Sequence, residues 1–286
     1  MGMKDKAYFV VPGFQKAGTT YLHTMLIQHP DIYLTKSKEL EYFSRDFGKS
    51  AYENYFNQIG SEVYYGDISP QYLYTPGTAK NIRKYRHDTK IIILIRDPIE
   101  RFISHARMGE RRCEIESLDS LLRESDLTIK ETDYYKYTLY QTMIIEYIDQ
   151  FPLEQILFVE SDLLLKNPEK ALYEIENFLQ VSHFKYKGIG AEVHKGGSVR
   201  FRQISSLINF MIGLLKPYKS FIASFVSLRN VSKILFLIET KWNVKRENQT
   251  TLSEENYRKL LRIFKSQYKY IESLKKEKGC NFVFRG

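Results

Sequence analysis

The sequence contains little cysteine, a single tryptophan and no uninterrupted apolar run long enough to cross a membrane. Its two cysteines, Cys113 and Cys280, lie far apart and lack the spacing of metal ligands, which excludes a disulfide framework and a zinc site but permits one bridge. The apolar stretch between Ile204 and Ile238 is interrupted by lysines, an arginine and Pro217, so it predicts amphipathic core helices rather than a membrane span. A peripheral membrane contact is the alternative for this stretch.

The charge of the chain is unbalanced toward the basic side. The 286 residues include 43 Lys and Arg against 34 Asp and Glu, which gives a formal net charge of +9. This excess favours an anionic partner: a nucleic acid, an acidic membrane face, an acidic polysaccharide or a phosphorylated cofactor. A generally basic, solvated surface explains the same number, so charge alone does not choose among these partners.

Short apolar segments alternate with helical patterns along the chain, and no repeat, low-complexity segment or linker interrupts them. We therefore predict a single domain over residues 1–286. It is an α/β fold of the P-loop NTPase-like kind, a parallel β-sheet of about five strands flanked by helices, with ligand sites at the carboxyl ends of the strands. The predicted strands are Ala7–Val11, Ile32–Leu34, Val63–Ile68, Lys90–Ile95 and Gln155–Glu160.

A glycine-bearing loop follows the first predicted strand and leads into a helical pattern. The loop, Pro12–Thr20, carries Lys16, Gly18 and two threonines at the junction with the helix. Loop N–H groups and the helix dipole both favour a bound anion, so this stretch predicts a phosphate site. Its lysine stands two residues before the second glycine, whereas nucleotide triphosphatases place the lysine directly after that glycine.

This loop resembles the 5′-phosphosulfate loop of sulfotransferases that use 3′-phosphoadenosine 5′-phosphosulfate (PAPS). The resemblance extends over nearly the whole chain and implies PAPS as the donor and 3′-phosphoadenosine 5′-phosphate (PAP) as the product. It implies that no metal is required, which agrees with the missing Lys-Ser/Thr pair. The residues that it assigns to the 5′ end of the donor are Lys16, Ala17, Gly18, Thr19 and Thr20.

A second segment, Lys36–Phe43, follows the second predicted strand. It resembles the Glu-x-x-x-Phe segment of heparan-sulfate-type and related bacterial sulfotransferases, and this implies that Glu39 is the catalytic base. A carboxylate at this edge of the sheet is suited to take the proton of an acceptor hydroxyl. Glu41 remains an alternative base, because residues two apart on an extended segment share a face. The other reading of Glu39 is an ordinary surface glutamate.

The third predicted strand ends in Asp67-Ile68-Ser69-Pro70, which resembles the Glu-Lys-Ser-Pro segment of the same family. Ile68 stands where some heparan sulfotransferases have an active-site lysine, so a second cation would come from elsewhere, with Lys38 or Lys36 as candidates. Asp67 replaces the family glutamate. The sequence leaves open whether it orients the acceptor or Lys16, or only ends the strand.

Two further segments resemble the parts of the family that hold the 3′-phosphate. Arg96 ends the buried strand Lys90–Ile95, and Ser104 lies two turns into the helix that Asp97 and Pro98 begin. The planar, forked guanidinium of an arginine suits bidentate hydrogen bonding to a phosphate. The alternative is that Arg96 pairs with a carboxylate. The loop with Lys195 and Gly196 is the last candidate, with Arg200 or Arg202 as replacements for Lys195 and a flexible basic loop as the alternative.

The resemblance implies in-line transfer of a sulfuryl group from PAPS to a hydroxyl or amine of an acceptor. Glu39 takes the proton, while Lys16 and the N–H groups near Gly18 stabilise charge on the leaving 5′-phosphate. Basic pockets around Lys16 and Arg96 are expected to hold opposite ends of the donor. The positive charge and the 22 tyrosines favour an acidic or neutral saccharide or a glycolipid as the acceptor.

No apolar signal region precedes the first predicted strand. Eukaryotic Golgi sulfotransferases carry a membrane anchor before the catalytic domain, and this sequence shows none. We therefore expect a cytoplasmic bacterial enzyme or a piece of a longer protein. A P-loop nucleotide kinase would use Glu160 or Asp162 to hold Mg²⁺. A basic nucleic-acid-binding protein would rest on the net charge alone, so we expect no nucleic acid as a partner.

Overall fold

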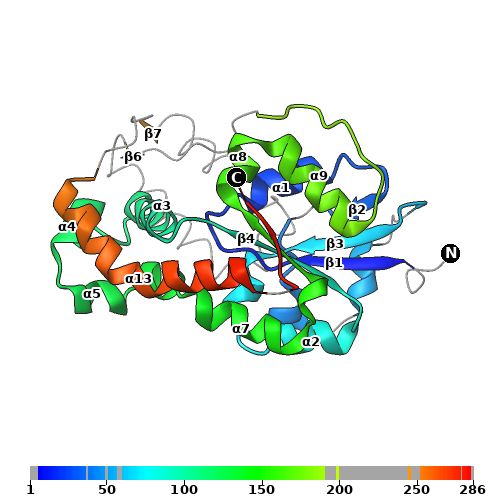
Figure 1. The fold of residues 1–286 in the computed structure, drawn as a ribbon, viewed down its shortest axis with the longest axis horizontal. Coiled ribbons are helices and arrows are strands. Elements are labelled where there is room, and N and C mark those ends of the chain that lie inside the picture. Colours follow the sequence, from blue (N-terminus) through cyan, green and yellow to red (C-terminus); the bar gives the residue numbers. More distant parts are fainter. Residues whose placement is uncertain are drawn as a thin grey trace, which may run out of the picture. The chain divides into compact units, whose positions relative to one another are not determined.

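A computed structural model describes residues 6–36, 38–48, 51–56, 60–190, 252–277 and 279–284, and the backbone of 198–199 and 244–245. In this part of the chain a parallel sheet lies between two layers of helices (Figure 1). The strands are β1 (Ala7–Val11), β2 (Ile32–Leu34), β3 (Tyr64–Ile68), β4 (Lys90–Ile95), β5 (Ile156–Glu160) and β8 (Asn281–Val283).

The sheet has the strand order β2-β3-β1-β4-β5-β8, and every neighbouring pair is parallel. The predicted α/β class and the five predicted strands are confirmed, with boundaries that agree to within one residue. The sixth strand, β8, was missed because its three residues lack a buried apolar run; their side chains are half-buried or exposed. It pairs with β5 at the edge of the sheet.

The central strands are buried on both faces, which explains their continuous apolar sequences. In β4 the side chains from Ile91 to Ile95 are at most 2% exposed, and Phe9 to Val11 of β1 are fully buried. Because β1 lies between β3 and β4, the carboxyl ends of these strands meet at one edge of the sheet. The loops after Val11, Ile68 and Ile95 therefore start side by side.

Helices α1, α8 and α9 cover one face of the sheet, and α2 and α7 cover the other (Figure 1). The α-helices are α1 (Thr19–Leu26), α2 (Thr78–Tyr85), α3 (Pro98–Arg111), α4 (Leu118–Arg123), α5 (Asp126–Glu131), α6 (Asp133–Lys136), α7 (Tyr140–Gln150), α8 (Ser161–Lys166), α9 (Pro168–Leu179) and α13 (Glu254–Lys276). Single turns of 3₁₀ or π type are η2 (Tyr42–Asp46), η3 (Tyr52–Phe56), η4 (Pro70–Leu73) and η5 (Leu153–Gln155).

The chain divides into two compact units. The first consists of residues 1–101, 136–193 and 263–286 and contains the six-stranded sheet; the second consists of residues 102–135 and 194–262. In the second unit Ser117 caps α4, and the strands β6 (Ser198–Val199) and β7 (Val244–Lys245) pair antiparallel. A single domain over 1–286 stays a prediction, and the stretch Ile204–Ile238 lies outside the described residues.

Gly66 lies in β3 directly opposite Phe9 of β1, and its lack of a side chain leaves room for the phenyl ring. A Cβ at position 66 would lie 2.3 Å from two atoms of that ring. We expect Gly66→Ala to lower the free energy of unfolding by about 1–3 kcal/mol, because the fully buried ring must shift to admit the added methyl group. Urea denaturation measures the change. Val63→Ala, at a side chain that is 51% exposed, should stay within about 0.5 kcal/mol of the original protein, and an equal loss in both variants would contradict this account.

Candidate active site

The predicted phosphate loop lies at the carboxyl end of the central strand β1 and enters α1. Gly18 precedes the helix in the left-handed conformation (φ 95°) and provides no side-chain cap for its first N–H groups. Gly13 allows a close approach, since a Cβ there would lie 2.5 Å from the Cγ2 of Thr19. Lys16 also has a positive φ, 70°, which is uncommon for a residue with a side chain. The uncapped N–H groups and the tight turn fit an anionic ligand such as a phosphate.

Residues from three other elements hold this loop in place. The buried Ser161 hydroxyl, at the start of α8, donates to the carbonyl of Ala17 at 2.5 Å, and the hydroxyl of Tyr74 accepts the N–H of Gln15 at 2.8 Å. Phe14 is fully buried and packs on Tyr140 of α7, with ring centroids 4.1 Å apart. These supports were missed at the sequence level, because no local pattern links such distant positions to the loop.

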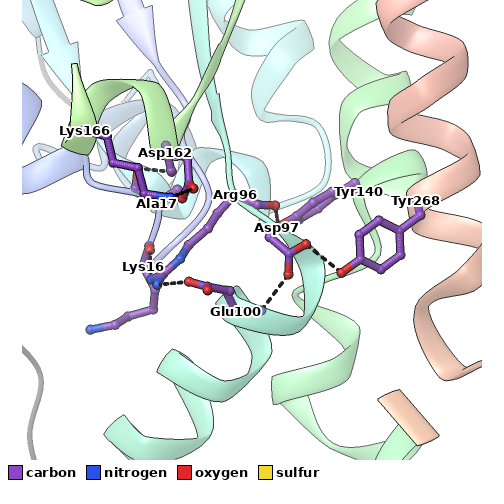
Figure 2. Close-up of polar contacts among 10 residues, drawn as sticks. Lys16, Ala17, Arg96, Asp97, Glu100, Tyr140, Asp162, Lys166 and Tyr268 are labelled. Carbon is purple, nitrogen blue, oxygen red and sulfur yellow. Dashed lines mark hydrogen bonds and ion pairs between the residues drawn. The ribbon is translucent and has the colours of Figure 1, made fainter. Parts of the chain in front are cut away.

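Arg96, directly after β4, lies against the backbone of the loop (Figure 2). Its Nη1 donates to the carbonyl of Lys16 at 2.8 Å, and its Nη2 donates to the Glu100 carboxylate at 2.9 Å. The Nε atom is buried and has no hydrogen-bond partner within the part of the chain that the structure describes. The hydroxyl of Tyr140 donates to the backbone carbonyl of Arg96 at 2.7 Å. The guanidinium thus keeps one buried N–H that could still donate a hydrogen bond, and it lies beside a phosphate-type loop. This arrangement fits a phosphate ligand.

The side chain of Lys16 extends away from the Arg96 guanidinium in Figure 2, although the two residues touch through the Lys16 carbonyl. Arg96 binds the backbone of the loop that carries the lysine, and the expectation of two basic pockets stays a prediction. The cap at the start of α3 is as predicted, because Asp97 Oδ1 accepts the N–H of Glu100 at 2.9 Å. Its Oδ2 accepts the hydroxyl of Tyr268 at 2.6 Å, a contact that the sequence did not indicate.

The segment after β2 carries both candidate bases, and both have left-handed backbones. The φ values are 66° for Glu39 and 54° for Glu41, and such residues concentrate at functional sites. The Glu39 side chain is 44% exposed and forms an ion pair with Lys38, one of the two candidates for the second cation. The Glu41 side chain is 19% exposed and pairs with Arg45 at 2.7 Å. Glu39 is therefore the more accessible of the two carboxylates.

Asp67, near the end of β3, is 2% exposed and accepts hydrogen bonds from several directions. The hydroxyl of Ser69 donates to Oδ1 at 2.6 Å, and the hydroxyls of Tyr72 and Tyr52 donate to Oδ2 at 2.5 and 3.2 Å. The N–H of Leu40 also donates to this carboxylate. Burial raises the pKa of Asp67 to about 6, against the lowering effect of these donors.

The structure does not test the remaining predicted residues. Ser104 is half-buried on the part of α3 that belongs to the second unit, so its convergence with Arg96 stays a prediction. Lys195 and Gly196 lie outside the described residues, as do the alternatives Arg200 and Arg202. Ile68, where part of the family has a lysine, is 2% exposed and belongs to the core.

The carboxylates that a kinase would need are engaged with lysines. Glu160 forms an ion pair with Lys275 at 2.8 Å, and Asp162 pairs with Lys166 one turn along α8. Among the described residues, no group of three or more His, Cys, Asp or Glu side chains is arranged to hold a metal ion.

The raised pKa of Asp67 makes the stability of the protein depend on pH. Because the folded protein binds this proton more tightly than the unfolded chain, the contribution of Asp67 to stability falls as pH rises from about 4 to about 7. Asp67→Asn removes this titrating group. The difference in the free energy of unfolding between the variant and the original protein should therefore shift in favour of the variant by about 2–3 kcal/mol from pH 4 to pH 7. Denaturant unfolding at both pH values tests this.

Asp88→Asn is the matched control for that measurement. The Asp88 carboxylate pairs with Arg86 at 2.8 Å, and this hydrogen bonding lowers its pKa instead of raising it. The control should therefore show no such improvement between the two pH values, and an equal improvement in both variants would contradict the assignment to Asp67.

Comparisons with known proteins agree with this geometry. The family described as the sulfotransferase domain matches residues 6–187. Heparan sulfate glucosamine 3-O-sulfotransferase 3B1 of Mus musculus is 28% identical over 186 residues, which is 62% of this chain and 47% of that protein. The membrane-associated sulfotransferase kil1 of Dictyostelium discoideum is 36% identical over 101 residues, 34% of this chain and 21% of its own length. The chain thus spans about half the length of the heparan sulfate relative.

These relatives contradict the expected location. Relatives from mouse, human and Dictyostelium discoideum are eukaryotic proteins, and one of them is named membrane-associated, so the expectation of a cytoplasmic bacterial enzyme was wrong. That expectation used the lack of an apolar leader, which a sequence covering half of its relatives' length cannot establish. Within the described ranges, no helix is long and apolar enough to span a bilayer.

A solved sulfotransferase structure shares the fold. The sulfotransferase of Alicyclobacillus acidocaldarius superimposes with a TM-score of 0.54 and is 26% identical; the match covers 78% of this chain and 98% of that one. The parallel sheet, the loop at the end of β1 and the match over residues 6–187 lead to one conclusion: this chain belongs to the sulfotransferase family.

Proposed function

We propose that this chain transfers a sulfuryl group from PAPS to a hydroxyl or amine of a saccharide or glycolipid acceptor. The observation that carries the proposal is the loop Pro12–Thr20. It ends in helix N–H groups without a side-chain cap and lies beside the Arg96 guanidinium, at the carboxyl edge of a parallel sheet. In open α/β sheets ligands bind at this edge. Family membership supports the reaction class.

The two phosphate ends of PAPS match two kinds of donor at this edge. The N–H groups of Gly18, Thr19 and Thr20 with the Lys16 ammonium suit the 5′-phosphosulfate, because they stabilise charge on the oxygen that leaves. Arg96, with its buried and unsatisfied Nε, suits the 3′-phosphate. Ser104, Lys195 and Gly196 complete the 3′-phosphate site in this proposal.

Glu39 is the proposed general base. Its carboxylate is the more exposed of the two candidates and follows β2, at the same edge of the sheet as the loop. The acceptor oxygen forms a bond to sulfur while the bond from sulfur to the 5′-phosphate oxygen breaks. The acceptor proton passes to Glu39, and PAP leaves with the electron pair of the broken bond. Lys38, paired with Glu39, lies close enough to that carboxylate to hold it in place.

The proposed acceptor class rests on charge and on the named relatives. The net charge of +9 favours an acidic acceptor, and one relative is named for a glucosamine of heparan sulfate. Transfer of labelled sulfate from PAPS to a panel of heparan sulfate, other glycans and glycolipids tests the proposal. Mg²⁺-dependent ATP binding without PAPS-dependent transfer would favour a nucleotide kinase instead, although its candidate carboxylates, Glu160 and Asp162, are paired with lysines.

Glu39→Gln should lower kcat for sulfate transfer by about 10²–10⁴-fold, because the amide cannot accept the acceptor proton. The affinity for PAP, measured by calorimetry, should stay within about twofold, since the base is not assigned to the donor. Glu41→Gln is the matched variant and should keep kcat within about threefold. Full turnover in Glu39→Gln together with loss in Glu41→Gln would move the base to Glu41.

Arg96→Ala should weaken the binding of PAP by about 10–100-fold, the usual range for loss of hydrogen bonds to a charged group. Adenosine 5′-phosphate lacks the 3′-phosphate, so it should lose less affinity than PAP does, and its loss measures the support that Arg96 gives the loop through the Lys16 carbonyl. Lys80→Ala removes an exposed cation from α2 and serves as the control for general electrostatic attraction. Equal losses for both nucleotides would show that Arg96 acts only by holding the loop through the Lys16 carbonyl.

A further inference from the structure

The segment from Glu39 to Phe43 has a backbone that needs support. Two of its residues, Glu39 and Glu41, adopt the left-handed conformation that side chains disfavour. Such a conformation persists only where surrounding contacts fix it. Since the candidate base is one of these residues, the contacts that fix the backbone also fix the direction of its carboxylate.

Three N–H groups of this segment lead to one carboxylate, that of Asp67. The N–H of Leu40 donates to it directly. The N–H of Glu41 donates to the Ser69 hydroxyl at 3.2 Å, which itself donates to Asp67 Oδ1 at 2.6 Å. The N–H of Phe43 donates to the Tyr72 hydroxyl at 3.4 Å, and this hydroxyl donates to Asp67 Oδ2 at 2.5 Å.

The surroundings of Asp67 are buried and hydrogen-bonded. It belongs to a strand buried along its whole length, and its Oδ2 also accepts the hydroxyl of Tyr52, which is 1% exposed. The Tyr52 hydroxyl in turn forms a 2.5 Å hydrogen bond with that of Tyr8 in β1. The carboxylate thus links the segment to two strands of the central sheet.

We propose that Asp67 is a positioning residue for sulfuryl transfer: its buried carboxylate fixes the segment Glu39–Phe43 and so directs the Glu39 side chain toward the acceptor. This inference rests on the proposed function, which makes Glu39 the base. A carboxylate suits the task because it accepts several hydrogen bonds at once, whereas an amide or a hydroxyl would turn a donor toward one of these partners. A residue that only ended the strand would not need four donors converging on it.

Amide hydrogen exchange tests the positioning directly and needs no acceptor. In Asp67→Asn, the amides of Leu40, Glu41 and Phe43 should exchange at least about tenfold faster than in the original protein. The amides of the loop Pro12–Thr20, to which none of these hydrogen bonds leads, should keep their rates. Acceleration in both segments would mean general destabilisation, and no acceleration in either would mean that Asp67 does not hold the segment; each result overturns the proposal.

A kinetic cycle tests whether the effect reaches the reaction through Glu39. With PAPS and heparan sulfate, Asp67→Asn should lower kcat at least about tenfold and leave KM for PAPS within about twofold. Adding Asp67→Asn to Glu39→Gln should cost no more than about twofold further, because the group being positioned is already disabled. Losses that multiply in the double variant would overturn the proposal.

The controls separate this inference from the proposed function. Tyr85→Phe removes a hydroxyl from the same aromatic cluster, one that donates to Glu53 at 2.9 Å, and should keep kcat within about twofold. If Glu39→Gln keeps full turnover, the proposed base is wrong, and the cycle is repeated with Glu41→Gln. If the losses from Asp67→Asn and Glu41→Gln then multiply in the double variant, the positioning role is overturned as well. Should Asp67→Asn fail to fold, Ser69→Ala removes one bridging hydroxyl and must show the same pattern of exchange and kinetics on a smaller scale.

Discussion

The hydrogen bond from the Arg96 guanidinium to the Lys16 carbonyl is the contact on which this site depends. It joins the residue that ends β4 to the loop that follows β1, and these strands are neighbours in the sheet. The loop backbone at Lys16 is left-handed, which is costly for a residue with a side chain, so an outside contact is needed to hold it. Tyr140 and Glu100 in turn hold Arg96.

A second connection of the same kind lies on the other side of β1. Asp67 near the end of β3 binds the segment that follows β2, again a pair of neighbouring parallel strands. In both places a charged side chain from one strand end supports the backbone of an adjacent loop. The sheet fixes the spacing of the strand ends, and the two side chains fix the loops that extend beyond it.

These supports carry a thermodynamic cost. An ionised Asp67 in a nearly closed environment is less stable than the same group in water, and this is why burial raises its pKa to about 6. The Nε of Arg96, which has no hydrogen-bond partner among the described residues, is a similar cost that a bound anion would remove. Functional sites typically contain groups that lower the free energy of unfolding, because the geometry that a ligand requires takes precedence there.

The sequence by itself determined the parallel α/β class, the five main strands and the phosphate-type loop, because buried strands and a strand-loop-helix junction have local patterns. It also indicated the family, which the comparisons confirmed. Only the tertiary structure decided the partners of those residues. Ser161 on the Ala17 carbonyl, Arg96 on the Lys16 carbonyl and four donors on Asp67 join positions up to 144 residues apart in the chain. Such pairings follow from strand order, which no local pattern encodes.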